Sequence, residues 1–179
     1  MSDEELLRRY HAGGGRLAAA NARGLSVVPS LHTVVLTCMD SRIDAFALFG
    51  LELGEVHVLR NAGGVVTDDV VRSLTISQRK LGTRDVFLVQ HTQCGLSTFT
   101  DEEFSEELAV DVGMRPPWRT HAFVDPVVNV RRGMARLRHD PFLMPDTTVR
   151  GFVLDIEKFV LEEVALEEPD SAREHNPFP

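Results

Sequence analysis

Short runs of apolar, often β-branched residues recur along the chain and alternate with longer amphipathic stretches. The clearest of these runs is TVVLT at 33–37, and DVFLVQ at 85–90 is of the same kind. Runs of this length without polar alternation are typical of buried strands in a parallel sheet. The pattern predicts strands at 33–37, 56–59, 85–90, 150–154 and 158–161, with a tight turn joining the last two.

The stretches between the strands carry helical signals. Thr67 or Asp68 is suited to cap a helix, and Gly82 is suited to end it. Three glycines at 13–15 interrupt the N-terminal stretch, which therefore forms either two helical pieces or a helix and a loop. Because helices alternate with strands, we predict an α/β fold with a mostly parallel central sheet flanked by helices. The predicted helices are 4–23, 45–49, 69–81, 97–110 and 126–139.

Length and composition narrow the class of protein. A chain of 179 residues with 43% hydrophobic residues suits one domain with a real core, spanning 1–179. We expect residues 1–30 to form an N-terminal helical arm and 168–179 to form a loose tail. The net charge of −8 argues against nucleic-acid binding. The chain has no apolar run of about 18 residues and no signal-peptide pattern at its start, which predicts a cytoplasmic protein without membrane contact.

Two segments that contain potential metal ligands follow predicted strands. CMDSR at 38–42 follows the first strand, and HTQCG at 91–95 follows the third. In a parallel sheet the carboxyl ends of the strands lie at one edge, where ligands of open α/β sheets bind. If these two strands are neighbours, Cys38, His91 and Cys94 meet there. Two thiolates and an imidazole suit Zn²⁺, and three protein ligands leave a fourth position for water, as in catalytic zinc sites.

Two charged residues accompany the first cysteine. In an extended chain, Cys38, Asp40 and Arg42 point to the same side. Two thiolates neutralise the charge of zinc, so lowering the pKa of a bound water toward neutrality needs help from nearby groups. Asp40 can accept a hydrogen bond from zinc-bound hydroxide, and Arg42 can hold Asp40 ionised and oriented through a bidentate pair. We therefore predict catalytic roles for Asp40 and Arg42.

Each half of this pattern also has a simpler interpretation. A cysteine in a strand is usually a small buried side chain, and an Asp–Arg pair is most often structural. The two cysteines could also form a redox disulfide, although neither lies in a C-x-x-C motif. A zinc-binding module without catalytic activity is a further alternative, which the presence of Asp40 and Arg42 disfavours.

The combined motif resembles a known family. C-x-D-S-R, followed some fifty residues later by H-x-x-C, resembles the β-class carbonic anhydrases. RNAGG at 60–64 and RSL at 72–74 support the resemblance, which is densest from Val34 to Gly95. The short chain and VVTDD at 65–69 resemble the small bacterial branch of that family.

The resemblance implies a function and a site. The chain would hydrate carbon dioxide reversibly to bicarbonate and a proton by zinc-bound hydroxide, with one zinc ion held by the two cysteines and the histidine. Asp40 and Arg42 would form the catalytic dyad, and the backbone at Gly63 and Gly64 would shape the substrate pocket. In a closed state known in some members, the aspartate itself binds zinc, so Asp40 is a possible fourth ligand.

The resemblance also implies an assembly and an alternative substrate. Family members form dimers in which the N-terminal helix embraces the partner, so we expect a homodimer or a higher homo-oligomer. Related proteins with this zinc motif hydrolyse carbonyl sulfide or carbon disulfide, which is the alternative function. The sequence departs from many members because its only tyrosine is Tyr10. Val35 stands where some members carry the tryptophan of a regulatory bicarbonate pocket, so we predict no such regulation.

Overall fold

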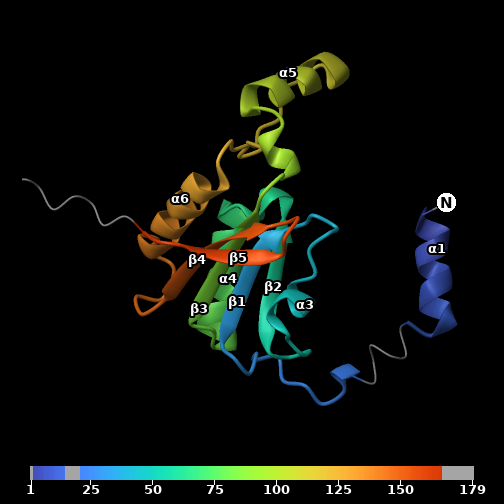
Figure 1. Cartoon of the computed structure of the whole chain (residues 1–179), viewed down its shortest axis with the longest axis vertical. Helices are drawn as coiled ribbons and strands as arrows, with labels where there is room; N and C mark the ends of the chain where they lie inside the picture. The colour runs from blue at the N-terminus through green and yellow to red at the C-terminus, as the bar shows by residue number, and fades with distance from the viewer. Residues whose placement is uncertain (1, 15–20, 167–179) are drawn as a thin grey trace, which may run out of the picture.

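A five-stranded sheet forms the centre of the computed structural model, which describes residues 2–14 and 21–166 (Figure 1). The strands lie in the order β2-β1-β3-β4-β5. Four of them are parallel, and β5 runs antiparallel to β4. The predicted α/β fold with a mostly parallel sheet is confirmed. The strands are β1 (Thr33–Cys38), β2 (Val56–Asn61), β3 (Asp85–His91), β4 (Thr148–Asp155) and β5 (Val160–Val164).

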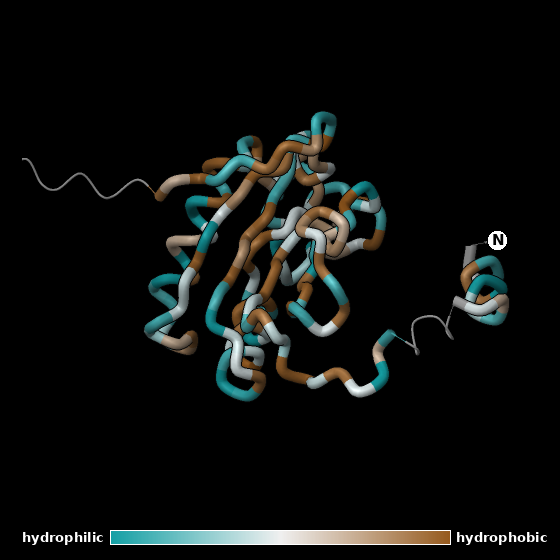
Figure 2. Tube along the Cα trace, turned by 60° about the horizontal axis from the view of Figure 1, so that its bottom comes forward, coloured by the Kyte–Doolittle hydropathy of each residue, from teal (hydrophilic) through white to brown (hydrophobic). Residues whose placement is uncertain are grey.

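The two faces of the sheet are covered differently. Helices α4 (Asp68–Leu81) and α6 (Pro126–Arg138) pack on one face, and the short helix α3 (Ala45–Phe49) packs on the other (Figure 1). The first face buries a core that includes Leu36, Leu88, Leu74 and Met134 at 1% exposure or less. Hydrophobic residues accordingly follow the central strands in Figure 2. The main hydrophobic core therefore lies between the sheet and helices α4 and α6.

Capping residues explain where the helices begin. Of the two predicted caps of α4, Thr67 is the one that accepts a hydrogen bond from the Val70 N–H, and Asp68 is the first residue of the helix. The prediction of a helix over 97–110 is wrong at its start, because α5 runs from Asp101 to Val112. Thr100 and Glu103 form a capping box that fixes this start, and a separate 3₁₀ turn, η3 (Gly95–Ser97), precedes it.

The N-terminal stretch is not one continuous helix. Helix α1 (Ser2–Arg9) leads into a π-helical turn, η1 (Tyr10–Gly14), where Gly13 has a φ of 127° that breaks the helical backbone. Residues 15–20, within the predicted 4–23 helix, and the predicted tail at 168–179 lie outside the described residues. Figures 1 and 2 show α1 lying away from the sheet. No helix in the described ranges is long and apolar enough to cross a membrane.

Candidate metal centre

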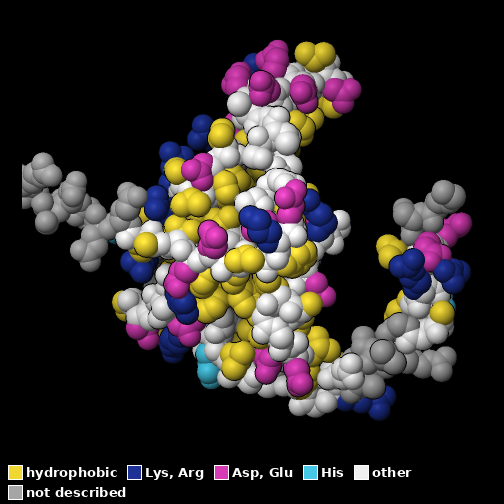
Figure 3. Space-filling view, viewed as in Figure 1, with side chains coloured by type: hydrophobic (Ala, Val, Ile, Leu, Met, Phe, Trp, Pro, Cys, Tyr) yellow, Lys and Arg dark blue, Asp and Glu magenta, His cyan; other side chains and the backbone are white. Residues whose placement is uncertain are grey.

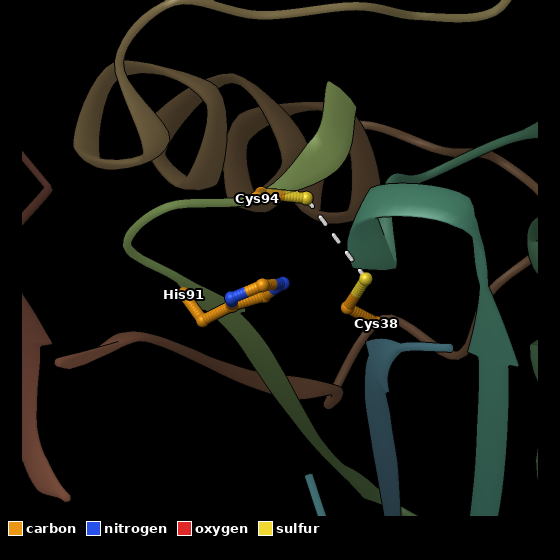
Figure 4. A group of neighbouring side chains, drawn as sticks. All are labelled: Cys38, His91 and Cys94. Atoms are coloured by element: carbon orange, nitrogen blue, oxygen red, sulfur yellow. Dashed lines mark hydrogen bonds between the residues drawn. The ribbon is translucent and has the colours of Figure 1, made fainter. Parts of the chain in front are cut away.

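Cys38, His91 and Cys94 come together at the carboxyl edge of the sheet (Figure 4). β1 ends at Cys38 and its neighbour β3 ends at His91, so the parallel pairing of these strands brings the two residues to one place. Their ligand atoms and the Cys94 sulfur all lie within 4.8 Å of one another. All three residues are buried. Within the described part of the chain, this is the one such group of potential ligands.

The arrangement of these atoms fits a zinc ion. The two sulfurs are 4.0 Å apart, and sulfurs bound at about 2.3 Å to a tetrahedral zinc would lie about 3.8 Å apart. His91 Nδ1 donates to the carbonyl of Thr92 at 2.8 Å, which leaves the lone pair on Nε2. Nε2 is buried and has no hydrogen-bond partner in the structure. Such a nitrogen is unfavourable in a protein interior unless it binds a ligand.

The two thiols influence each other's ionisation. The hydrogen bond between the sulfurs lowers the pKa of one thiol, Cys38, and raises the pKa of the other, Cys94. His91 and the backbone groups of Asp40 and Gly63 further favour the Cys38 thiolate. The site therefore favours the thiolate form of Cys38. Binding of a metal would release the remaining proton from Cys94, because the metal binds cysteine as the thiolate.

Asp40 and Arg42 form a bidentate ion pair beside the ligand group. Arg42 Nε donates to Asp40 Oδ1 at 2.9 Å, and Nη2 donates to Oδ2 at 2.7 Å. These bonds hold the pKa of Asp40 well below its usual range. Asp40 Oδ2 lies 3.8 Å from His91 Nε2. The Asp40 carboxylate thus lies next to the three potential ligands. It is bound to Arg42 and is not one of the ligand group.

The turn at Gly63 and Gly64 packs directly against the end of β1. Both glycines have positive φ angles, 76° and 59°. A Cβ atom on Gly64 would lie 2.8 Å from the backbone nitrogen of Cys38, which is closer than real Cβ contacts allow. The Asn61 side chain closes the turn by exchanging hydrogen bonds with the backbone N–H and carbonyl of Val65.

Comparisons with known proteins agree with this geometry. A family model described as carbonic anhydrase matches residues 33–121, which include all three potential ligands. Over 140 residues, the chain is 46% identical to β-carbonic anhydrase 1 of Mycobacterium tuberculosis, covering 78% of this chain and 86% of that protein. The chain belongs to the β-carbonic anhydrase family.

Other β-carbonic anhydrase relatives extend the comparison. A carbonic anhydrase structure from Streptococcus mutans matches with a TM-score of 0.82 and 35% identity, covering 89% of this chain and 97% of that one. A carbon disulfide hydrolase from Acidianus is 30% identical over 151 residues, covering 69% of this chain and 72% of that protein. The identities to the Mycobacterium and Streptococcus carbonic anhydrases, 46% and 35%, are higher than the 30% to this hydrolase. β-Carbonic anhydrases use zinc, which agrees with the Cys-His-Cys group.

In this β-carbonic anhydrase, Arg60 supports the site through contacts that the sequence did not predict. Arg60 Nε donates to the carbonyl of Cys38 at 2.9 Å, and Nη2 donates to the carbonyl of Asp40 at 2.7 Å. One guanidinium thus braces the segment that carries a potential ligand and the dyad carboxylate. The sequence indicated Arg60 only as part of the RNAGG segment at 60–64. That segment supports the family resemblance but does not indicate these hydrogen bonds.

Proposed function

We propose that this chain catalyses the reversible hydration of carbon dioxide to bicarbonate and a proton at a zinc ion held by Cys38, His91 and Cys94. The observation that carries the proposal is the buried Cys-His-Cys group with an ionised carboxylate beside it. A purely structural zinc site needs no such carboxylate. When bound, zinc would supply a Lewis acid that activates a water molecule for attack on the carbon of the substrate.

The neighbouring residues have distinct roles in this proposal. Asp40 accepts a hydrogen bond from the attacking water and orients it, because its carboxylate is ionised and faces the ligand group. Arg42 fixes the carboxylate through two hydrogen bonds. The backbone at Gly63 and Gly64 forms the adjacent wall of the substrate pocket. Asp40 is also the candidate fourth zinc ligand of a closed state, because its Oδ2 lies 3.8 Å from His91 Nε2.

The Asp40→Ala variant tests the role of the carboxylate. We expect it to retain zinc, because the three ligands are unchanged. Its CO₂ hydration rate should fall by a factor of about 100 or more. Zinc content by atomic emission and stopped-flow hydration at alkaline pH measure both effects. Asp69→Ala, which removes an exposed carboxylate paired with Arg72, is the matched control and should keep full activity. Full activity in Asp40→Ala would refute the proposed role.

Hydrolysis of carbon disulfide or carbonyl sulfide is the second candidate function. An apolar cavity of about 370 Å³ lies beside the glycine turn and the metal loop. It is lined in part by Ala62, Leu96, Phe99, Phe104 and Trp118. None of the proposed ligands or dyad residues lines this cavity, so the candidate rests on the similarity to a carbon disulfide hydrolase. Sulfide release, measured on the zinc-loaded protein beside CO₂ hydration, decides between the substrates.

We also propose that the chain forms a homodimer in the cytoplasm, where a reducing environment keeps ligand thiols free. Leu6, Leu7 and Tyr10 on the N-terminal segment are at least 60% exposed, and Figure 3 shows hydrophobic side chains gathered over the sheet face toward the viewer. A second copy would cover such surfaces. Light scattering should give about twice the chain mass of 19.9 kDa. Leu7→Asp should lower that mass, whereas Glu4→Gln should not, and a monomeric wild type would contradict the proposal.

A further inference from the structure

The loop that carries the last proposed zinc ligand is held against the turn between β4 and β5. The Thr92 N–H donates to the carbonyl of Leu154 at 2.9 Å, and the Ile156 N–H donates to Thr92 Oγ1 at 3.1 Å. The next residue, Gln93, donates from its side-chain Nε2 to Glu157 Oε1 at 2.7 Å. One contact between backbone groups, one between a backbone N–H and a side chain, and one between side chains therefore join the loop to the end of β4 and the turn after it.

Gln93 also contacts the dyad through its backbone. Its carbonyl accepts a hydrogen bond from Arg42 Nη2 at 3.2 Å, and the same nitrogen donates to Asp40 Oδ2 at 2.7 Å. An Nη2 group carries two hydrogens, so both bonds can exist together. Gln93 has a φ of 53°, which residues with a side chain rarely adopt unless surrounding contacts hold them there.

The turn offers a rigid support for Gln93. Asp155 Oδ1 accepts hydrogen bonds from the backbone N–H groups of Glu157 and Lys158, both at 3.0 Å. The Phe159 N–H donates to the carbonyl of Asp155 at 2.8 Å. The backbone that presents the Glu157 carboxylate is therefore fixed by the turn itself. A hydrogen bond to an ionised acceptor is also stronger than one between neutral groups.

We propose that Gln93 and Glu157 are positioning residues for the Asp40–Arg42 dyad. Glu157 holds the Gln93 side chain, the unfavourable backbone conformation of Gln93 is thereby maintained, and its carbonyl stays in place to bind Arg42. Arg42 in turn keeps Asp40 oriented. The catalytic consequence rests on the proposed CO₂ hydration, whereas the contact between Arg42 and Gln93 can be measured without it.

The Glu157→Ala variant tests the proposal by removing the support while leaving every proposed ligand and both dyad residues in place. We expect kcat/KM for CO₂ hydration to fall about fivefold, the size that suits loss of one partly exposed hydrogen bond, with zinc content unchanged. Glu157→Gln should restore most of the activity, because its side-chain oxygen can still accept from Gln93. Glu162→Ala, which removes an exposed carboxylate on the adjacent strand β5, is the control and should match the wild type.

Coupling to Arg42 separates positioning from a general effect on the loop. In an Arg42→Ala background, Glu157→Ala should cause no further loss, because the group through which it acts is gone. A further fivefold loss in the double variant would overturn the proposal. Gln93→Ala, which keeps the carbonyl and the unfavourable positive φ but removes the side chain that Glu157 holds, should reproduce the effect of Glu157→Ala.

Crystal structures of the wild type and of Glu157→Ala provide a readout besides activity. The proposal expects the hydrogen bond between Arg42 Nη2 and the Gln93 carbonyl in the wild type and its loss or lengthening in the variant. An unchanged bond in the variant would overturn the inference. If the wild type shows no CO₂ hydration, the proposed function fails, but this structural comparison still decides the positioning role.

Discussion

Replacement of Cys94 by alanine is expected to abolish zinc binding and to reduce CO₂ hydration to the uncatalysed rate. The variant keeps only Cys38 and His91 as strong ligands, and two ligands hold zinc far more weakly than three. The loss should be nearly complete because the three residues are the one ligand group in the described ranges, and Asp40, the candidate fourth ligand, is held by Arg42. Metal analysis of the purified variant and stopped-flow hydration measure the two effects.

Thr98→Ala is the control for this substitution. Thr98 lies in the same loop, is exposed, and its hydroxyl donates to the carbonyl of Gly95 and not to a proposed ligand. This variant should keep its zinc and its activity. If Cys94→Ala retained a full complement of zinc, the ligand set would have to be different. If it retained activity without zinc, the metal would have no part in the reaction.

Substitution of Gly64 by alanine should disrupt the site through the backbone. The added Cβ would lie 2.8 Å from the nitrogen of Cys38, 2.9 Å from the carbonyl carbon of Thr37 and 3.1 Å from the oxygen of Val89. These are backbone atoms of β1 and β3, which cannot rotate away as a side chain can. We expect the free energy of unfolding to fall by about 3 kcal/mol, and zinc retention to fall because Cys38 must shift.

Gly113→Ala separates the two causes of this loss. Gly113 has a φ of 77°, close to that of Gly64, but a Cβ there would meet no atom within 4 Å. Its substitution should cost only the left-handed backbone penalty of about 1 kcal/mol and leave zinc unaffected. Urea unfolding of both variants gives the comparison. Equal losses would mean that close packing against β1 does not matter.

The sequence predicted the centre of the site because strand ends carry it. Cys38 and His91 end two strands that the apolar runs identify, and parallel neighbours must bring their carboxyl ends together. What the runs could not supply was the order of the strands. The prediction that the ligands meet depended on β1 and β3 being neighbours, and the structure shows that they are.

Contacts between distant loops were beyond prediction from the sequence. Glu157 lies 64 residues after Gln93, and nothing in the pattern of either segment indicates that they meet. The strand predicted at 158–161 also differs from β5, which starts at Val160 because residues 156–159 form the turn. The start of α5 was misplaced for a different reason: the capping box of Thr100 and Glu103, a local signal present in the sequence, sets the boundary and was overlooked.

The central claim is that zinc bound by this chain hydrates CO₂, and reversible removal of the metal tests it most directly. CO₂ hydration is measured by stopped flow on one preparation as purified, after removal of metal with a chelator, and after zinc is added back, with zinc content determined at each stage. We predict one zinc per chain and a rate well above background at first, background after chelation, and recovery with zinc. Full zinc content without hydration, or hydration that survives complete removal of the metal, would contradict the account.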